Sequence, residues 1–354
     1  MKRMGSVIRL RFPLVLAALL AACSSTGVPL DRGDDGDGID LAERVPLSDL
    51  APDRYLGFEG GLYPGGGNVP PPDHAAEGAR RAALVQPLDA QGRPDPGGWI
   101  VLLSIGMSNT TQEFCGGPPP CDPWTFAGQA AVDPLVDHAT VAIVDGAFGG
   151  EPAEDWESPD HENYLRILEE RLAPRGLTEA QVQAVWIKQA NGRPERSLPD
   201  PAADAYVLER SLGGIVRALE ERYPNLQIVY LSSRTYGGYA LTQLSPEPYA
   251  YETGFAVKWV VSAQIEQART GGAIDAESGD LAYTRAPWLA WGPYLWADGT
   301  EPRDDGLRWL RSDFGLDGTH PSRAGAAKVG DLLLDFLTTA PTARCWFVVG
   351  QSCG

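Results

Sequence analysis

The chain has few histidines and few positive charges, and both shortages restrict what it can do. Four histidines occur in 354 residues, at positions 74, 138, 161 and 320, so the choice of an imidazole base is small. Lysine and arginine number 29 against 47 aspartates and glutamates, which gives a formal net charge of −18. Such a surface repels phosphate backbones and argues against nucleic acid as a partner. The chain also lacks an internal repeat and any His/Cys/Asp cluster at metal-ligand spacing, so we expect neither a metal nor an organic cofactor.

The N-terminus has an apolar run, but it is too short to cross a bilayer comfortably. Residues 12–22 are apolar and follow four basic residues, which is the pattern of an export signal. The run ends in Leu20-Ala21-Ala22-Cys23, which resembles the lipobox of bacterial lipoproteins with Cys23 as the lipidated residue. The alternative is a secretory signal that is cleaved after Ala22. We predict a signal peptide at residues 1–22 and an exported bacterial lipoprotein, at the outer membrane, in the periplasm or on the cell surface, that meets the membrane only through its lipid anchor.

Four further cysteines remain in the chain, and an exported protein meets an oxidising compartment. Four cysteines allow three pairings, and we expect the two local ones, Cys115–Cys121 and Cys345–Cys353. The first pair would close a stiff Pro-rich loop that begins seven residues after Ser108, so we expect it near the acyl site described below. The second would pin a small hairpin or loop within a C-terminal tail, residues 341–354. Free buried thiols are the alternative.

The segments before residue 99 differ in composition from the rest of the chain. Residues 23–54 are polar and acidic, and we interpret them as a tether. The alternation of Asp and Gly from Asp31 to Asp40 leaves calcium binding as the alternative there. Residues 55–98 form a Gly/Pro/Tyr-rich extension, whose aromatic residues favour an ordered wrap over the following domain.

From residue 99 onward, apolar strand-like runs alternate with amphipathic helical patterns. The runs cover residues 99–105, 139–144, 182–188, 226–231 and 287–291, and the helical patterns cover residues 160–172, 203–223, 253–269 and 322–337. Ser322 is a candidate N-cap for the last helix. Continuous apolar strands alternating with helices indicate a three-layer α/β domain of flavodoxin-like type, residues 99–340, with a central parallel sheet covered by helices on both faces.

Residues suited to acyl transfer follow these runs, at the edge where ligands of parallel sheets bind. The residues after the first four runs include Ser108, then Gly149 and Gly150, then Asn191, and then Arg234, Tyr236 and Tyr239; Asp317 and His320 precede the last helix. A serine, a histidine and an aspartate that can meet are sufficient for nucleophilic catalysis. The sequence therefore predicts that a nucleophile, amide donors and an Asp/His pair meet at one edge of the sheet.

This order resembles the SGNH hydrolases, the GDSL-like esterase superfamily, over roughly residues 99–340. Ser108, Gly150, Asn191 and the pair Asp317 and His320 match the four blocks of that family. Gly150 is preferred to Gly149 because the family's glycine lies six residues after the last hydrophobic residue of the strand, here Val144. The resemblance implies catalytic roles for Ser108, Asp317 and His320, and an oxyanion hole made of the Ser108 and Gly150 amides and the Asn191 side chain.

Two departures from the family pattern refine the expected activity. The usual Gly-Asp-Ser is Gly-Met-Ser here, and Asn191 is followed by glycine rather than aspartate. The Ser108-Asn109 pair is similar to the Gly-Gln-Ser-Asn motif of carbohydrate acetylesterases related to sialate O-acetylesterase. We therefore expect a serine esterase that removes O-acyl groups, above all O-acetyl groups, from carbohydrate through an acyl-enzyme. A lipase or arylesterase of the same fold, and a non-catalytic glycan-binding lipoprotein, are the alternatives.

Four residues are candidate substrate contacts: Asn109, Arg234, Tyr236 and Tyr239. The aromatic-rich segment 283–314 either stacks on sugar rings or packs in the core. The other three histidines are expected to be solvated residues of loops or helices.

Overall fold

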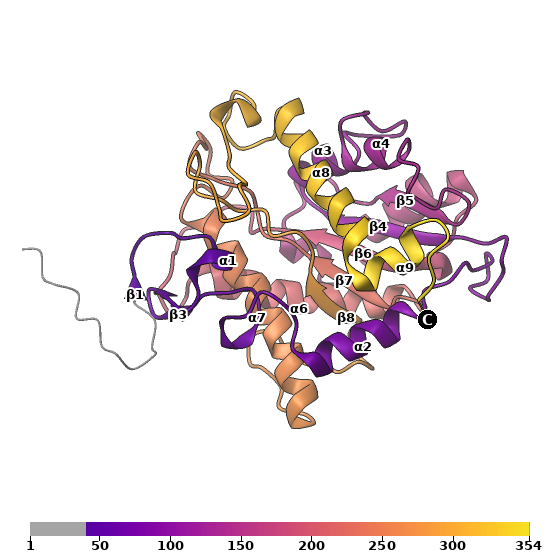
Figure 1. The fold of residues 1–354 in the computed structure, drawn as a ribbon, viewed down its shortest axis with the longest axis horizontal. Helices are drawn as coiled ribbons and strands as arrows, with labels where there is room; N and C mark the ends of the chain where they lie inside the picture. The colour runs from indigo at the N-terminus through magenta and orange to yellow at the C-terminus, as the bar shows by residue number, and fades with distance from the viewer. Residues whose placement is uncertain (1–39, 354) are drawn as a thin grey trace, which may run out of the picture. The chain divides into compact units, whose positions relative to one another are not determined.

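The computed structural model describes residues 40–353, and a parallel sheet lies at their centre (Figure 1). Its strands run in the order β5 (Val141–Asp145), β4 (Ile100–Gly106), β6 (Val182–Lys188), β7 (Ile228–Leu231) and β8 (Trp288–Trp291). Every neighbouring pair is parallel. These strands lie where the apolar runs predicted them, and the predicted α/β fold class is confirmed. The strand order reverses direction between β4 and β6, which is where ligands of such sheets bind.

The strands are apolar on both faces because each face is covered. In β4, Val101, Leu103 and Ile105 belong to one buried cluster, whereas Ile100 and Leu102 belong to the other. This alternation follows from the two-residue period of a strand. The sheet therefore separates two hydrophobic cores, as in a three-layer domain.

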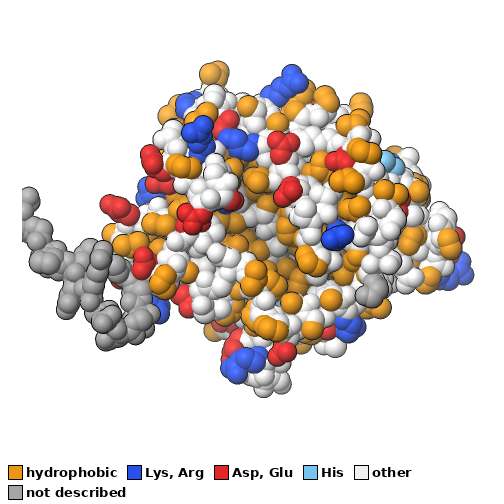
Figure 2. Space-filling model, viewed as in Figure 1, with side chains coloured by type: hydrophobic (Ala, Val, Ile, Leu, Met, Phe, Trp, Pro, Cys, Tyr) orange, Lys and Arg blue, Asp and Glu red, His pale blue; other side chains and the backbone are white. Residues whose placement is uncertain are grey.

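Different helices cover the two faces of the sheet. One core contains residues of α6 (Asp204–Arg222) and α7 (Tyr249–Thr270), which pack against each other behind the sheet in Figure 1. The other core lies under α8 (Arg323–Thr339) and α9 (Pro341–Phe347), with α2 (Pro72–Ala82) beside them in front. Figure 2 shows this front face, on which acidic and basic side chains are interspersed among hydrophobic and uncharged ones.

Shorter elements complete the domain. They are α3 (Ser108–Phe114), α4 (Phe126–Ala130), α5 (Glu162–Arg166), the π-helical turn η3 (Ile167–Leu172), and the 3₁₀ turns η1 (Pro64–Gly66), η2 (Ala153–Trp156), η4 (Ala173–Arg175), η5 (Glu179–Gln181) and η6 (Arg311–Asp313). None of the helices within residues 40–353 has the length and apolar character needed to cross a bilayer.

The residues around Ser322 start α8 as expected. The Ser322 hydroxyl accepts a hydrogen bond from the Gly325 amide at 3.4 Å, which caps the helix. By contrast, α7 begins at Tyr249, four residues before the expected start, because the chain already turns into the helix after Pro248.

The N-terminal boundary of the domain differs from the sequence-based one. Residues 40–54, assigned to the tether, are part of the fold. They include α1 (Leu47–Leu50), and β1 (Asp40–Leu41) and β2 (Arg54–Tyr55) form a small sheet with β3 (Phe58–Glu59). Leu47 and Leu50 are buried in the core beside α7, and the Leu47 amide donates to the Tyr294 hydroxyl at 3.0 Å. The overall composition of residues 23–54 is polar, and it does not reveal that Leu47 and Leu50 lie one helical turn apart and can enter the core together. The signal peptide, Cys23 and residues 31–39 lie outside the described residues.

The C-terminal tail also differs from expectation. Residues 341–347 form the helix α9, in which Ala343, Trp346 and Phe347 are buried. The bridge Cys345–Cys353 joins this helix to the loop that follows it, so of the two expected forms, hairpin or loop, the loop is present. Pro341 suits the first position of a helix, where no amide donor is needed. The structure contains both local disulfides, Cys115–Cys121 and Cys345–Cys353.

Candidate active site

Ser108 is the first residue of α3, directly beyond the carboxyl end of β4. The turn is tight: a side chain at Gly106 would place its Cβ 2.1 Å from Thr110 Oγ1 and 2.4 Å from the Lys188 carbonyl oxygen. Only glycine fits there, so the strand can pass straight into the helix. The first amides of a helix have no partner within it, which leaves the Ser108 N–H available to an oxyanion.

A chain of hydrogen bonds joins Ser108, His320 and Asp317. Ser108 Oγ lies 2.8 Å from His320 Nε2, and His320 Nδ1 lies 2.5 Å from Asp317 Oδ2. The carboxylate fixes the proton on Nδ1, so Nε2 can accept the proton of the serine hydroxyl. The structure therefore brings together three residues that are 212 and 3 positions apart in the sequence, as the sequence predicted.

Asp317 is held in its ionised form. Partial burial raises the pKa of its carboxyl, but hydrogen bonds from the His320 ring and from the amides of Thr319 and His320 outweigh this, and the pKa lies below its usual range. Both amides donate to Oδ1 at 3.0 Å, which leaves Oδ2 for the imidazole. Asp317 is therefore negatively charged at neutral pH and can stabilise an imidazolium.

The loop that carries His320 is fixed by contacts that the sequence did not reveal. The Leu241 amide donates to the Asp317 carbonyl oxygen at 2.8 Å, and Thr242 Oγ1 lies 3.0 Å from Thr319 Oγ1. Gly318 has a φ of +68°, and a Cβ there would lie 1.7 Å from the Tyr239 carbonyl oxygen. The glycine in Asp-Gly-Thr-His is the sequence signal for this close approach. The partners in residues 239–242 follow a different strand, β7, so the local sequence around His320 does not indicate them.

Asn109 has a different position from the one expected. It was a candidate substrate contact, but the structure buries it and uses its amide nitrogen to donate to the Thr319 carbonyl oxygen at 2.8 Å. It thus connects the helix of Ser108 to the loop of His320.

The glycine pair after β5 lies beside Ser108. The Phe148 amide donates to the Gly106 carbonyl oxygen at 2.9 Å, and a Cβ at Gly149 would lie 3.4 Å from Ser108 Cβ. The amide of Gly150 has no acceptor among residues 40–353. The loop that carries Gly150 is therefore next to Ser108, and a role of the Gly150 amide as an oxyanion donor stays a prediction.

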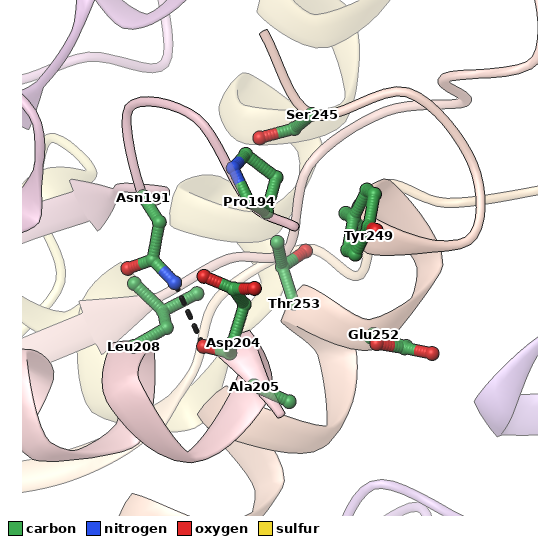
Figure 3. Close-up of a pocket in the computed structure, with 9 residues that line it drawn as sticks. All are labelled: Asn191, Pro194, Asp204, Ala205, Leu208, Ser245, Tyr249, Glu252 and Thr253. Carbon is green, nitrogen blue, oxygen red and sulfur yellow. Dashed lines mark hydrogen bonds between the residues drawn. The ribbon is translucent and has the colours of Figure 1, made fainter. Parts of the chain in front are cut away.

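Asn191 follows β6 and faces the start of α6 (Figure 3). Its amide nitrogen donates to the Asp204 carbonyl oxygen at 2.7 Å, while its Oδ1 is buried without a partner among the described residues. Asn191 also lines a small cavity of about 10 Å³ with Asp204, Leu208 and Thr253. A carboxamide has two N–H donors, and the bond to Asp204 uses one of them. A role of Asn191 as an oxyanion donor stays a prediction.

A buried ion pair lies beneath the site and was not anticipated. Lys188 lies at the end of β6, and its Nζ donates to both carboxylate oxygens of Glu113 on α3. The distance from Nζ to Oε1 is 2.6 Å, and each side chain is 1% exposed. Burial raises the pKa of Glu113 and lowers that of Lys188 to about 8, and the attraction between the two groups opposes both shifts. The sequence signal that could have indicated this ion pair is a lysine at the last position of an apolar strand.

A second buried carboxylate connects α3 to the other neighbouring strand. Asp145, at the end of β5, accepts hydrogen bonds from Thr111 on α3 and from Ser104 of β4, the latter at 2.6 Å. Burial raises the pKa of Asp145. Helix α3 is thus bonded to β5 on one side and to β6 on the other.

The remaining predicted contacts lie after β7. Arg234 is 7% exposed, and Tyr236 and Tyr239 are half-buried and pack edge to face with ring centroids 5.0 Å apart. The Tyr239 hydroxyl donates to the Trp309 carbonyl oxygen at 3.1 Å. The large aromatic side chains of segment 283–314 are mostly buried in the core, including Trp288, Trp291, Tyr294, Trp296 and Trp309.

Two further expectations are corrected by the structure. His74 is buried rather than solvated: its Nε2 lies 2.7 Å from the Leu289 carbonyl oxygen, and burial lowers its pKa. The loop Cys115–Cys121 lies beyond the end of α3 opposite to Ser108, where it lines a groove with residues of β5 and the side chains of Arg171 and Arg175. It therefore does not form the expected wall of an acyl site.

One group of side chains could hold a cation, although the sequence suggested no metal site. One donor atom each from Glu151, Asp155 and His161 lies within 4.8 Å of the others, next to Gly150. The side chains are half-buried, and burial and the charge of Glu151 raise the pKa of Asp155. Partly exposed acidic groups also gather in this way without an ion, and we assign this cluster no role.

Removing one member of the buried pair should destabilise the fold strongly. Replacing Lys188 by methionine should lower the free energy of unfolding by about 3–5 kcal/mol, because Glu113 is left buried without its partner. The double variant Glu113→Leu/Lys188→Met should recover most of this loss. Urea denaturation followed by tryptophan fluorescence measures both. Arg269→Met, which breaks an exposed pair with Glu266, is the control and should cost less than about 1 kcal/mol; an equal loss in Lys188→Met and this control would contradict the role assigned to the pair.

Comparison with known proteins gives matches only among solved structures. No protein-family model matches the chain, and no curated protein sequence matches it. An extracellular lipase from Streptomyces rimosus is 15% identical over 67% of this chain and 99% of that chain, with a TM-score of 0.31. A GDSL-like lipase from Bacteroides thetaiotaomicron is 11% identical over 76% and 96%, with a TM-score of 0.33. A carbohydrate esterase family 2 enzyme from Corynascus thermopiles (Myceliophthora fergusii) is 17% identical over 70% and 68%, with a TM-score of 0.36.

Proposed function

We propose that this protein is a serine esterase of the SGNH type. The observation that supports this proposal is the hydrogen-bonded series Ser108 Oγ, His320 and Asp317, with distances of 2.8 and 2.5 Å, at the carboxyl edge of a parallel sheet. It combines a nucleophile, a base and a group that orients the base.

The reaction proceeds through an acyl-enzyme. His320 Nε2 takes the proton of Ser108 as Oγ attacks the carbonyl carbon of the ester. The oxyanion that forms is stabilised by the amides of Ser108 and Gly150 and by the free N–H of Asn191. His320 then returns the proton to the departing alcohol. Water, activated by the same imidazole, attacks the acyl-enzyme and releases the acid and Ser108.

The preferred ester is the O-acetyl group of a carbohydrate. The support is the sequence Gly106-Met107-Ser108-Asn109, which is similar to the Ser-Asn motif of carbohydrate acetylesterases. A lipase or arylesterase would use the same three residues, so the acyl group and the alcohol decide between these activities.

Ser108→Ala and His320→Ala should each abolish ester hydrolysis while leaving the fold intact, because each removes one end of the proton transfer. Asp317→Asn should be milder, since His320 keeps part of its orientation. The measurements are hydrolysis of p-nitrophenyl acetate and covalent labelling by a fluorophosphonate, with circular dichroism as the control for folding. Turnover in Ser108→Ala close to that of the wild type would rule out the mechanism, and a wild type that neither reacts nor labels would favour a glycan-binding protein.

Asn191→Ala should lower kcat by about 100-fold or more with little change in KM, because an oxyanion donor acts mainly in the transition state. Steady-state kinetics on one acetyl ester measure this. Asn109→Ala is the comparison variant, because the Asn109 side-chain amide donates to the Thr319 carbonyl oxygen in the His320 loop and is not an oxyanion donor. A change confined to KM in Asn191→Ala would make Asn191 a substrate contact.

Acetyl esters should be hydrolysed faster than longer ones. A series of p-nitrophenyl esters from acetate to palmitate, together with acetate release from acetylated sugars, measures this preference as kcat/KM. A maximum at about eight carbons or beyond, with no acetate released from any sugar, would support the lipase activity instead.

Cys23 is the proposed site of lipidation. Cys23→Ser should move the protein from membranes to the soluble fraction, because the lipid attached to this cysteine supplies the membrane affinity. Metabolic labelling with a lipid precursor tests this directly. A wild type that takes up no label, together with a variant that still pellets with membranes, would exclude a lipoprotein.

A further inference from the structure

A groove of about 400 Å³ lies outside the active site, between β3, α6, α7 and the loop that follows α7 (Figure 1). Helix α7 lines it with Trp259, Ser262 and Glu266, whose spacing of three and four residues places them on one face of the helix. Helix α6 lines it with Tyr206 and Glu209, which are also three residues apart. None of these side chains takes part in the proposed ester hydrolysis, so the groove is a separate feature of the molecule.

Three aromatic rings form one wall of the groove. Tyr206 and Trp259 stack nearly parallel, with ring centroids 4.9 Å apart and 12° between the ring planes. Phe58 of β3 adds a third ring, whose centroid lies 5.4 Å from that of Trp259. The three side chains pack on the core but stay half-buried, so part of each ring faces the groove. The face of an aromatic ring carries negative potential, which attracts a cation.

Glu209 places a buried carboxylate at this groove without a cation beside it. Its side chain lines the groove, the residue is 4% exposed, and its Oε1 accepts a hydrogen bond from Ser278 Oγ at 2.6 Å. Within residues 40–353, its Oε2 accepts no hydrogen bond and no basic nitrogen lies within 4 Å of the carboxylate. The neighbouring Arg210 pairs with Glu277 instead, at 2.7 Å. Buried carboxylates are normally paired, so the groove lacks a positive group.

The other acidic side chains add negative charge to the groove but do not form a metal site. Glu266 pairs with Arg269 at 2.7 Å, whereas the side chain of Asp275 accepts hydrogen bonds only from two backbone amides. In the part of the chain that the structure describes, no three acidic residues of the groove bring their oxygens within 4.8 Å of one another. A divalent metal ion needs several oxygen ligands around one point, so the groove does not suit one.

We propose that this groove binds a small organic cation, an alkylated ammonium of about the size of choline. The Glu209 carboxylate balances the charge of the ammonium, whose alkyl groups contact the faces of the aromatic rings. The volume of the groove lies within the range that small-molecule sites usually have. A neutral sugar could also stack on the rings, but it would leave Glu209 without a cation. This site does not depend on the proposed esterase function.

Choline and 3,3-dimethylbutan-1-ol are a matched pair of probes, because they have the same shape and differ in a quaternary nitrogen against a carbon. Calorimetric titration of the wild type should give a Kd for choline at least about 10-fold lower than for the alcohol, since only the cation is attracted by Glu209 and the ring faces. Glu209→Gln should raise the Kd of choline by about 10-fold or more and leave that of the alcohol within about 3-fold. Glu301→Gln is the control: it removes one charge from an exposed position between β8 and η6 and should change neither value.

The dependence of choline binding on pH needs no variant and covers the case in which Glu209→Gln does not fold. The pKa of Glu209 is raised to about 7, chiefly by burial; the charges of Asp275 and Glu277 add to the rise, and the charge of Arg210 and the hydrogen bond from Ser278 oppose it. Choline should bind the ionised carboxylate, so its affinity should rise by about 10-fold from pH 6 to pH 8, while that of the alcohol stays constant.

The remaining titratable groups at the groove do not produce this rise. The hydrogen bonds between Glu266 and Arg269 lower the pKa of the first and raise that of the second, and burial raises the pKa of Tyr206. None of these three groups therefore changes its charge between pH 6 and pH 8.

Several results would overturn the inference. They are equal binding of choline and the alcohol by the wild type, no binding of choline, an affinity for choline that does not change with pH, and a folded Glu209→Gln that binds choline as tightly as the wild type. Tighter binding of methyl glucoside than of choline would assign the groove to sugars, and tighter binding of Nα-acetyllysinamide would assign it to a side chain of another protein. Glu209→Gln should hydrolyse p-nitrophenyl acetate at the rate of the wild type, so this inference and the esterase function can fail separately.

Discussion

The candidate site depends on how α3 is held at the carboxyl edge of the sheet. Strand β4 lies between β5 and β6, and the helix that follows it bonds to both neighbours: Asp145 accepts from Thr111, and Lys188 pairs with Glu113. The Thr110 hydroxyl adds a bond to the Lys188 carbonyl oxygen at 2.7 Å. Because these contacts come from two strands, the first residue of α3 cannot shift or rotate without breaking a buried polar bond. Ser108 is that residue.

Buried charges are an expensive way to fix a helix. A well-packed apolar contact between α3 and the sheet could be equally stable, since burial disfavours both ions of the Lys188 and Glu113 pair. Directional bonds, however, specify position more precisely than apolar packing does, and a nucleophile must lie within hydrogen-bonding distance of its base. The same reasoning applies to the His320 loop, which is bonded to Asn109 on one side and to Leu241 and Thr242 on the other. The site is therefore supported by polar contacts from several separate segments.

Local patterns predicted most of the secondary structure. The run at 182–188 coincides with β6, and the pattern at 203–223 with α6, because a strand buried on both faces and a long amphipathic helix each have a clear periodicity. The short elements were missed for the same reason. Leu47 and Leu50 occupy a single turn within a polar segment, and Pro341–Phe347 is too short to show a helical period. Their helical form depends on the core that they cover.

The sequence by itself determined the parallel α/β architecture and the presence of Ser108, Asp317 and His320 at strand or helix ends, because periodicity and a three-residue spacing are local properties. Tertiary structure alone decided how the site is supported and what charge surrounds it. Asn109 bonds to the His320 loop, Lys188 pairs with Glu113, and Arg234 Nε is buried without a hydrogen-bond partner among residues 40–353, since each outcome depends on residues from distant strands. Hydrogen bonds and ion pairs act over a few ångströms, and a linear pattern does not reveal which distant groups the sheet brings within that distance.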